Sequence, residues 1–237
     1  MVDISVIVPT LNEEKYLEQG LQSIRAQKTV HSFELILADG GSVDKTLDIA
    51  KKYADKIINV KKKGIAFGRN EGAKHSSGKL LVFIDADTRI PMNYIDVIHA
   101  VMRDPDLGAL SCAFRFDEKN NMLKLVEEIS NKYMLLKGSV GKGELLGFNN
   151  AIKRDLFFEV GGFPNVPLED GALAKIIREI KKVMFLPTPT VVTSARRLKK
   201  GGILHSALYY TNLELLSISD SDALKKASLF KDYKAVR

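Results

Sequence analysis

Tryptophan is absent from the 237 residues, and cysteine occurs once, as Cys112. A single cysteine cannot form an intramolecular disulfide, which excludes a small disulfide-stapled fold. No apolar run reaches the roughly 18 residues that a transmembrane helix needs. The nearest candidate, "GILHSALYYTNLELLSI", is interrupted by His205, Asn212 and Glu214. With no signal-like start either, we expect a cytoplasmic protein, with attachment to the cytoplasmic membrane face as the alternative.

Several nucleotide- and nucleic-acid-binding motifs are also missing. The chain contains no G-x-x-x-x-G-K-[ST] loop, and no G-x-G-x-x-G follows its first apolar run. These absences argue against a P-loop NTPase and against a dinucleotide-dependent oxidoreductase. Zinc-ligand spacing, RNA-recognition motifs and aromatic-interleaved basic ribbons are absent too, so nucleic acid is not an expected partner.

What is present is typical of a globular protein with a basic surface. Hydrophobic residues make up 45% of the chain and charged residues 27%, and the net charge is +7. The length suits one α/β domain covering residues 1–237. Lysine runs such as "VKKKG" and "RRLKKGG" either solvate the surface or attract phosphate-bearing ligands or an anionic membrane.

Apolar runs and helix-like stretches alternate strictly in the first half. Strands are predicted at 4–9, 33–39, 56–60 and 80–85, and helices at 13–27, 43–54 and 66–76. Such alternation predicts a mostly parallel, Rossmann-like sheet, and runs that are apolar on both faces predict helices on both sides of it. Asn12 and Ser42 are in positions that suit helix N-caps.

The second half is mixed. It predicts a helix at 91–103, a strand at 107–114, a long helix at 121–138, a helix from near Glu169, and short strands "VMFLP" and "TVVTS". An amphipathic C-terminal helix is predicted from about residue 203. We therefore expect an α/β fold with a binding half at 1–90, a mixed second half at 91–200 and a helical tail at 201–237.

Polar side chains gather where the predicted parallel strands end. These ends read "PTLNEE", "ADGGSVDKT" and "DADTRIP", and they bring Asn12, Glu13, Asp39, Asp85 and Asp87 to one rim. Ligands of open parallel sheets bind at that rim. Asp85 and Asp87 are spaced so that both carboxylates can approach one Mg²⁺ or Mn²⁺ ion, which can also bridge a diphosphate. The alternative is structural: Asp85 ends the strand and Asp87 caps the following helix.

The segment "KKKGIAFGRNEGAKHSSG" (61–78) precedes the last of these strands. Its small residues, Gly72 and Ala73 among them, favour close packing of a helix on the sheet. Lys62 and Arg69 have no such packing role, and a cationic group here could reach a diphosphate.

Taken together, "ISVIVPTLNEEKYLEQGLQSI", "ADGGSVDKT", "GRNEGAKHSSGKLLVFIDADT" and "GGFPN…LEDGALAKIIRE" resemble the family 2 glycosyltransferases, which have the GT-A fold. The resemblance covers roughly residues 3–198, in order and spacing. It implies that the nucleotide of a nucleoside diphosphate sugar donor is lined by Pro9, Thr10, Asn12 and Glu13, and that Asp39 contacts its base. It also implies that Asp85 and Asp87 hold ribose and a metal–diphosphate, and that Asp170 is the general base of an inverting reaction. Without the family context, "LEDGAL" reads as a plain helix N-terminus.

Departures from the family narrow the expected activity. The Q-x-x-R-W motif of processive synthases is absent, so a polymerising enzyme is not expected. In its place stands "SARRLKKGG", and Arg196 and Arg197 are candidates for binding a donor diphosphate or a lipid-phosphate acceptor. His205 is either a third metal ligand or an ordinary surface residue. Asn149 and Asn150 in "GFNNAIKR" either hydrogen-bond sugar hydroxyls or form a turn.

The expected function is thus metal-dependent transfer of a single sugar to a glycan or lipid-phosphate acceptor. The basic C-terminal segment and the stretch 203–218 also allow peripheral membrane attachment. Two alternatives remain at this point: a sugar-phosphate nucleotidyltransferase, which would want a glycine-rich basic signature after the first strand, and a catalytically silent nucleotide-sugar-binding protein. Donor sugar, base, acceptor, metal and oligomeric state are not specified by the sequence.

Overall fold

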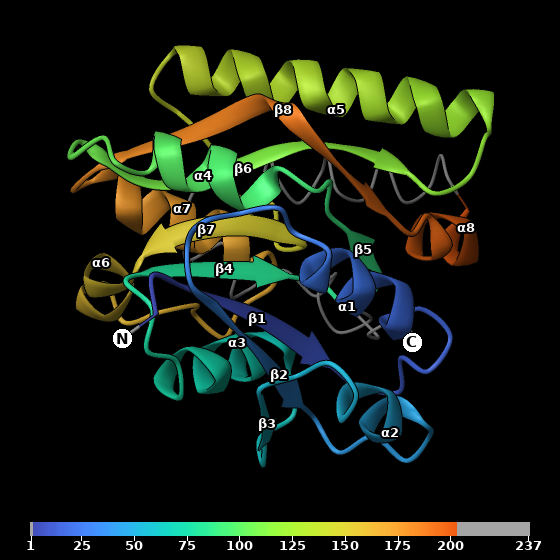
Figure 1. Cartoon of the computed structure of the whole chain (residues 1–237). Helices are drawn as coiled ribbons and strands as arrows, with labels where there is room; N and C mark the ends of the chain where they lie inside the picture. Colours follow the sequence, from blue (N-terminus) through green and yellow to red (C-terminus); the bar gives the residue numbers. More distant parts are fainter. Residues whose placement is uncertain (1, 203–237) are drawn as a thin grey trace.

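The computed structural model describes residues 2–202, which form one eight-stranded sheet covered by helices (Figure 1). The strands are β1 (Ile4–Thr10), β2 (Phe33–Asp39), β3 (Lys56–Asn59), β4 (Leu80–Ile84), β5 (Thr88–Arg89), β6 (Leu107–Phe116), β7 (Asn149–Lys153) and β8 (Lys182–Thr193). The helices are α1 (Leu17–Arg25), α2 (Thr46–Ala50), α3 (Ile65–Lys74), α4 (Tyr94–Val101), α5 (Asn121–Ser139), α6 (Arg154–Glu159), α7 (Glu169–Arg178) and α8 (Arg196–Gly201).

The strand order is β3-β2-β1-β4-β7-β6-β8-β5. The first four strands of the chain are parallel, and β6 is parallel to β8. Strand β7 runs antiparallel to both β4 and β6, and β5 runs antiparallel to β8. Every strand except β5 and β7 therefore points the same way, which confirms the predicted mostly parallel sheet.

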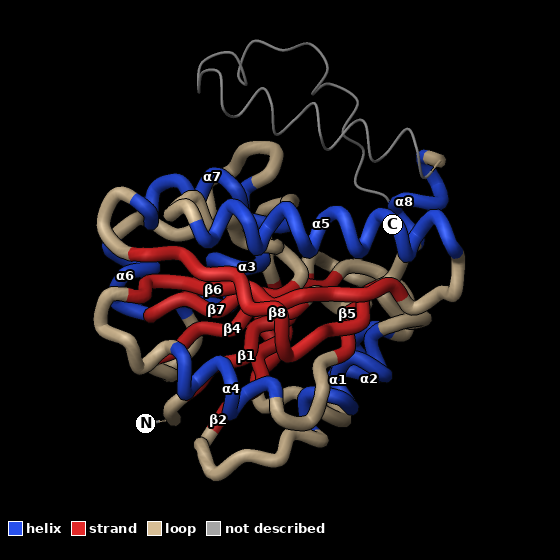
Figure 2. The backbone as a smooth tube through the Cα atoms, turned by 90° about the horizontal axis from the view of Figure 1, so that it is seen from above, coloured by secondary structure: helices blue, strands red, loops and turns tan. Residues whose placement is uncertain are grey.

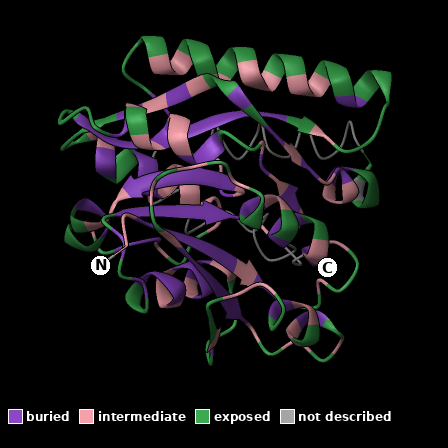
Figure 3. Cartoon of the chain, in the orientation of Figure 1, coloured by how far each residue is buried: buried purple, intermediate pink, exposed green. Residues whose placement is uncertain are grey.

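Helices cover both faces of this sheet, as predicted. Viewed from above, α3, α5, α6 and α7 lie on one side of the strands, and α1, α2 and α4 on the other (Figure 2). The middle strands are buried along almost their whole length (Figure 3), because both faces are covered. Alternate residues of one strand consequently enter two separate cores.

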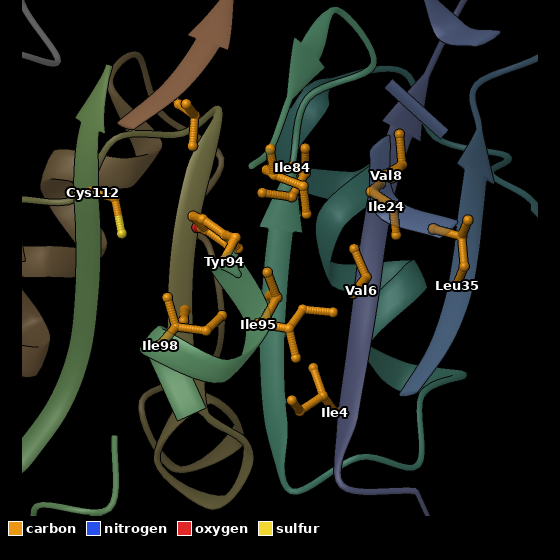
Figure 4. Packing of buried hydrophobic residues seen from close by; sticks show 14 of the residues in the cluster. Ile4, Val6, Val8, Ile24, Leu35, Ile84, Tyr94, Ile95, Ile98 and Cys112 are labelled. Carbon is orange, nitrogen blue, oxygen red and sulfur yellow. The ribbon is translucent and has the colours of Figure 1, made fainter. Parts of the chain in front are cut away.

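The two cores follow the alternation of side chains along a strand. Val6, Val8 and Leu35 belong to the core under α1 and α4, to which α1 contributes Ile24 and α4 contributes Tyr94, Ile95 and Ile98 (Figure 4). Ile7, Ile36 and Phe83 face the other way and pack with α3, α6 and α7. A strand that contributes to both cores must be apolar on both faces, which explains why "LLVFI" contains no polar residue.

Helix α3 packs closely on β1, as its small residues predicted. A Cβ added at Gly72 would lie 2.5 Å from Ile7 Cγ2, and one at Gly68 would lie 3.2 Å from Pro9 Cβ. These close approaches bring α3, and with it Arg69, against the carboxyl ends of the strands.

Two predicted N-caps are wrong. Helix α1 begins only at Leu17 and α2 only at Thr46, and neither has a side-chain cap. Asn12 instead adopts a left-handed conformation with φ of 55°, and its Oδ1 accepts from the backbone N–H of Val43 at 2.9 Å. Both polar residues tie the β1 and β2 loops together rather than starting helices.

Several elements beyond β4 differ from the prediction. The two predicted short strands form one long strand, β8, and the short strand β5 and helix α6 were not predicted. Segment 149–153, expected to be a wall or a turn, is the central strand β7. The predicted C-terminal helix from about residue 203 and His205 lie outside the described residues. No helix within 2–202 is both long and apolar enough to cross a membrane.

Candidate active site

The ends of β1 and β2 are joined by the carboxylate of Asp39, which is 3% exposed. Its Oδ2 accepts from the backbone N–H groups of Gly41 and Ser42, both at 2.9 Å. Its Oδ1 accepts from the hydroxyls of Ser42 at 2.5 Å and Thr10 at 3.3 Å. Asp39 thus orders the loop that follows β2, and its predicted contact with a nucleotide base stays a prediction.

The loop after β1 is held against the same segment. The Asn12 N–H donates to Ser42 Oγ at 2.9 Å, and the Glu13 N–H donates to Thr46 Oγ1 at 2.7 Å. The Glu13 side chain lies near the end of β4, where it and Asp87 both contact Arg196.

Asp85 and Asp87 follow β4 directly, on either side of the buried Ala86. Both side chains are largely buried, at 14% and 10% exposure. Burial raises the pKa of Asp87 to about 6; Asp85 and Glu13 add to the rise, while Arg196 opposes it. The predicted pair of carboxylates therefore lies at the sheet edge, under electrostatic strain that a cation would relieve.

Arg196, the first residue of α8, supplies one cation to this edge. Its Nη2 donates to Glu13 Oε1 at 2.7 Å, and its Nε lies 2.9 Å from Asp87 Oδ2 without the alignment of a hydrogen bond. The guanidinium also stacks over the ring of Tyr16, 4.6 Å from its centroid. Arg197 lies near enough to lower the pKa of Asp87. A pocket of about 440 Å³ opens beside Arg196, lined by Tyr16, Asp117, Glu118, Ser194, Arg196, Lys199 and Lys200.

Arg69 joins the two halves of the chain. Its side chain is 1% exposed. Nη2 donates to Asp85 Oδ1 at 2.9 Å and to the carbonyl of Gly147 at 2.8 Å, and Nη1 donates to Glu169 Oε1. The ring of Phe163 lies under the guanidinium, with its centroid 5.1 Å away. Arg69 therefore connects the predicted metal-binding aspartate with the "LED" segment, roles that the sequence had treated separately.

Asp170 lies in the first turn of α7, next to this arginine. Its Oδ2 accepts from the Gly147 N–H at 2.7 Å and its Oδ1 from the Gly171 N–H at 2.9 Å. Burial raises the pKa of Asp170 to about 7, and Glu169 adds to the rise, while Arg69 and the two N–H groups oppose it. A carboxyl with such a pKa can exchange a proton near neutral pH, as a general base must.

The backbone before α7 is constrained as well. Leu168 precedes the helix with φ of 54° and ψ of 49°, a left-handed conformation that is unfavourable for a leucine. Residues held in this region cluster at functional sites, where surrounding contacts compensate for the strain. Here the Glu169–Arg69 ion pair immediately follows the strained residue.

Gly147 contacts both ends of this cluster through its backbone. A Cβ added there would lie 2.8 Å from Arg69 Nη2 and 3.1 Å from Asp170 Oδ2. The position therefore requires glycine for steric reasons.

Gly147→Ala is expected to displace both side chains, to lower the free energy of unfolding by about 1–3 kcal/mol, as overpacking does, and to reduce any activity that needs Asp170. Urea unfolding measures the first effect. Gly138→Ala is the matched control, because a Cβ there meets nothing closer than 3.7 Å. Equal stability of the two variants would show that Gly147 is not constrained as described.

The residues present fit a divalent cation. Within 2–202 no three His, Cys, Asp or Glu side chains form a preformed metal cluster. Mg²⁺, however, is commonly held by one or two carboxylates together with substrate phosphates. Asp85 and Asp87 offer two such carboxylates, and the buried Glu13 Oε2 close by has no hydrogen-bond partner. A buried carboxylate oxygen without a partner is expected where a bound ligand or cation would supply the missing contact.

Not every predicted residue joins this cluster. Lys62 is exposed in the loop before α3, with its Nζ 5.4 Å from the Phe67 ring centroid. Asn149 is fully buried: its amide accepts from the Cys112 N–H and donates to the Cys112 carbonyl, so it completes the sheet rather than facing a sugar. Asn150 donates to the Leu146 carbonyl and thereby holds the loop that carries Gly147.

Three residues of the site were not predicted: Tyr16, Gly147 and Glu169. Glu169 could have been found from the sequence, because it is adjacent to the predicted Asp170. Gly147 lies in the glycine- and asparagine-rich segment that had been singled out for other reasons. Nothing in the sequence pairs Tyr16 with Arg196, because the contact joins opposite ends of the described chain.

Known proteins resemble this chain along most of its length. The family profile described as "Glycosyl transferase family 2" matches residues 5–161. An uncharacterized glycosyltransferase of Haemophilus influenzae is 30% identical over 187 residues, covering 76% of this chain and 73% of that protein. Validoxylamine A glucosyltransferase of Streptomyces hygroscopicus subsp. limoneus is 30% identical over 137 residues, covering 53% of this chain. The chain spans only 30% of the length of that second relative.

The fold has counterparts among solved structures. The mannosyltransferase PcManGT from Pyrobaculum calidifontis, solved in complex with GDP-Man and Mn²⁺, superposes with a TM-score of 0.68 at 24% identity. The match covers 82% of this chain and 59% of that one. At this identity the likeness establishes the fold, which is the predicted GT-A fold. The family profile and the Haemophilus relative establish the family: the chain is a member of glycosyltransferase family 2.

Proposed function

We propose that the chain transfers a single sugar from a nucleoside diphosphate sugar to an acceptor, with inversion and with the help of Mn²⁺ or Mg²⁺. The observation that carries the proposal is the buried connection from Asp85 through Arg69 to Glu169, beside Asp170 with its pKa of about 7. It joins a cation-binding edge to a proton acceptor, the two functions that inverting transfer requires. The GDP-Man and Mn²⁺ bound by PcManGT support this choice of donor and metal.

The donor half, residues 1–90, would bind the nucleotide. Pro9, Thr10, Asn12 and Glu13 line it, and Asp39 reaches the base from the loop that it orders. Asp85 and Asp87 hold the cation, whose chemistry is to neutralise charge on the departing diphosphate. Arg196 and Arg197, beside Asp87, add positive charge for the same group, and Asp85 also contacts the ribose.

The acceptor half, residues 91–200, would supply the proton acceptor. Asp170 takes the proton of the acceptor hydroxyl as its oxygen forms a bond to the anomeric carbon. The bond from that carbon to the diphosphate oxygen breaks, and the diphosphate leaves with the electron pair. Because base and leaving group lie on opposite faces of the sugar, the anomeric configuration inverts. Arg69 and the Gly147 N–H keep the carboxylate in place.

The acceptor class follows from the need for this base. A hydroxyl of a glycan or of a lipid-linked glycan must lose a proton, whereas a lipid phosphate, with a second pKa of about 6, is already largely ionised at neutral pH. A hydroxyl acceptor therefore makes full use of Asp170. The basic residues at 196–200 support an acceptor that also carries phosphate.

A transfer assay tests the proposal. The purified chain 1–237 is incubated with labelled UDP-, GDP- and dTDP-sugars and with vesicles containing polyprenyl phosphate or a polyprenyl-linked glycan, with Mn²⁺ or with EDTA. We expect metal-dependent transfer from one donor and, by NMR, a product of inverted configuration. A retained configuration would contradict the assignment of Asp170. Pyrophosphate release from an NTP and a sugar phosphate would instead favour the nucleotidyltransferase.

Asp87→Asn is expected to weaken metal-dependent binding of the donor nucleotide by at least about tenfold, or ~1.4 kcal/mol, because one of two carboxylate ligands is lost. Isothermal titration with the nucleoside diphosphate in the presence of Mn²⁺ measures this change. Asp48→Asn, on the exposed surface of α2, removes the same charge elsewhere and should bind like the wild type. Equal nucleotide affinity of the two variants would show that Asp87 is not a metal ligand.

A further inference from the structure

The outer face of α5 carries a continuous apolar stripe. Its members recur every three or four residues, so they lie on one face of the helix. They are Met122, Leu125, Ile129, Tyr133, Leu136 and Val140 just beyond its end, with exposures of 50%, 56%, 59%, 39%, 64% and 62%. From Met122 to Val140, at about 1.5 Å per residue, the stripe is roughly 27 Å long.

The inner face of the same helix combines polar side chains with Leu123 and Val126, which belong to a small apolar cluster with Ala195 and Leu198. Asn131 accepts from the Phe114 N–H at 3.1 Å and donates to the Phe114 carbonyl at 2.8 Å. Glu127 accepts from the Phe116 N–H. Leu123 is the one residue of α5 that is buried. Figure 3 shows this helix as mostly exposed, in contrast to the strands beneath it. Helix α5 therefore exposes most of its apolar side chains, whereas a surface helix usually buries them.

We propose that this outer face of α5 is a membrane-docking surface for an anionic lipid bilayer. An apolar stripe of this length on a monomer marks an interaction site. Between residues 119 and 142 the sequence has five lysines and two glutamates; Glu127 points inward, and Lys137 is paired with Glu144. Lys119, Lys132 and Lys142 are exposed at the ends and flank of the stripe. A basic helix with such an apolar face binds at the headgroup boundary of anionic membranes.

The C-terminal end of α5 is tied to the helix that carries Asp170. Lys137 pairs with Glu144 at 2.7 Å, and Glu144 pairs with Arg178 of α7 at 2.9 Å. A Cβ added at Gly171 would lie 3.7 Å from Glu144 Oε2. A bilayer docked on α5 would thus bring a lipid-anchored acceptor toward Asp170; this consequence, unlike the docking itself, rests on the proposed function.

The absence of tryptophan allows a direct test. Ile129→Trp and, as control, Val30→Trp each give the full-length chain a single tryptophan at an exposed position. Phosphatidylcholine vesicles with and without 30% phosphatidylglycerol are added, and emission and quenching by brominated lipids are recorded. We expect a shift to shorter wavelength and quenching for Trp at 129, only with the anionic vesicles, and neither change at 30.

Two further variants separate the face from the rest of the surface. Replacing Leu125, Ile129 and Leu136 together with serine is expected to lower the partition onto anionic vesicles at least tenfold in a flotation assay. Replacing Val30 and Met92 with serine should leave it unchanged. No binding of the wild type, equal loss in both variants, or a Trp at 129 already shielded from acrylamide without vesicles would overturn the proposal. The last outcome would mean that the chain itself or a second copy covers α5. None of these readouts depends on sugar transfer, so they fail independently of the proposed function.

Discussion

Asp170→Asn is expected to lower kcat for sugar transfer to a hydroxyl acceptor about 10²–10⁴-fold, the usual contribution of a positioned general base. Asparagine keeps the shape of the side chain, and its Oδ1 can still accept from a backbone N–H, but it cannot take a proton. Donor binding, measured by isothermal titration, should change little, because Asp170 is placed on the acceptor side. With a phosphate acceptor the loss should be much smaller.

The pH dependence of Asp170 gives the same variant a second readout. Its pKa is raised from 3.8 to about 7, so the wild-type rate should rise as the pH increases through about 7. Stability should respond in the opposite direction. The folded chain holds this proton more tightly than the unfolded chain, so the contribution of Asp170 to stability is present below about pH 4 and is lost as the pH rises through about 7. The Tm of Asp170→Asn minus the Tm of the wild type should therefore be more positive at pH 8 than at pH 4.

Asp155→Asn is the matched control, since it removes a carboxylate from the exposed first turn of α6. It should retain the wild-type rate and the wild-type pH profile. If Asp170→Asn transfers sugar to a hydroxyl at the wild-type rate, the proton goes elsewhere and the mechanism fails.

Arg69→Met is expected to lower the free energy of unfolding by about 3–5 kcal/mol, the cost of removing one partner from a buried ion pair. Asp85 and Glu169 would be left without their cation, and the Gly147 carbonyl would keep only the longer hydrogen bond from the Asn150 amide. Since Arg69 also holds down the pKa of Asp170, the pH at which the remaining activity appears should move upward. Urea unfolding at pH 7 and a pH–rate profile measure the two effects.

Arg103→Met removes an arginine from an exposed position and should change stability by no more than about 0.5 kcal/mol. Arg69→Lys separates charge from geometry, because a lysine ammonium cannot span several acceptors as the planar guanidinium does. Partial recovery of stability by lysine, with Asp170 still misplaced and activity low, is the expected result. A wild-type unfolding curve for Arg69→Met would show that the buried bridge does not hold the two halves together.

The donor rim could be predicted because it depends on local order in the sequence. Parallel strands that end in polar residues bring those residues to one edge, so Asp39, Asp85 and Asp87 were located without coordinates. The same reasoning gave the two-sided burial of "LLVFI", which fixes Asp85 at the edge. Asp170 required the family resemblance, since its own segment reads as a plain helix start.

The rest depends on contacts distant in sequence. Strand β7 was missed because Asn149 and Asn150 favour loops, yet the Asn149 amide pairs with the backbone of Cys112 and so replaces missing ladder bonds. Arg69 was predicted to reach a diphosphate, but it is separated by 100 residues from Glu169, its partner in the structure. Such pairings are decided by tertiary packing, which no local pattern encodes.

The central claim is that this chain binds a nucleoside diphosphate sugar through a metal held by Asp85 and Asp87. Thermal shift of the chain 1–237 against UDP-, GDP- and dTDP-sugars, with and without Mn²⁺, tests it most directly. Binding at 100 times Kd stabilises a protein by about 2.7 kcal/mol, so the predicted result is a clear rise in Tm for at least one donor, present with Mn²⁺ and lost with EDTA. A flat Tm across all donors, with metal and without, would contradict it.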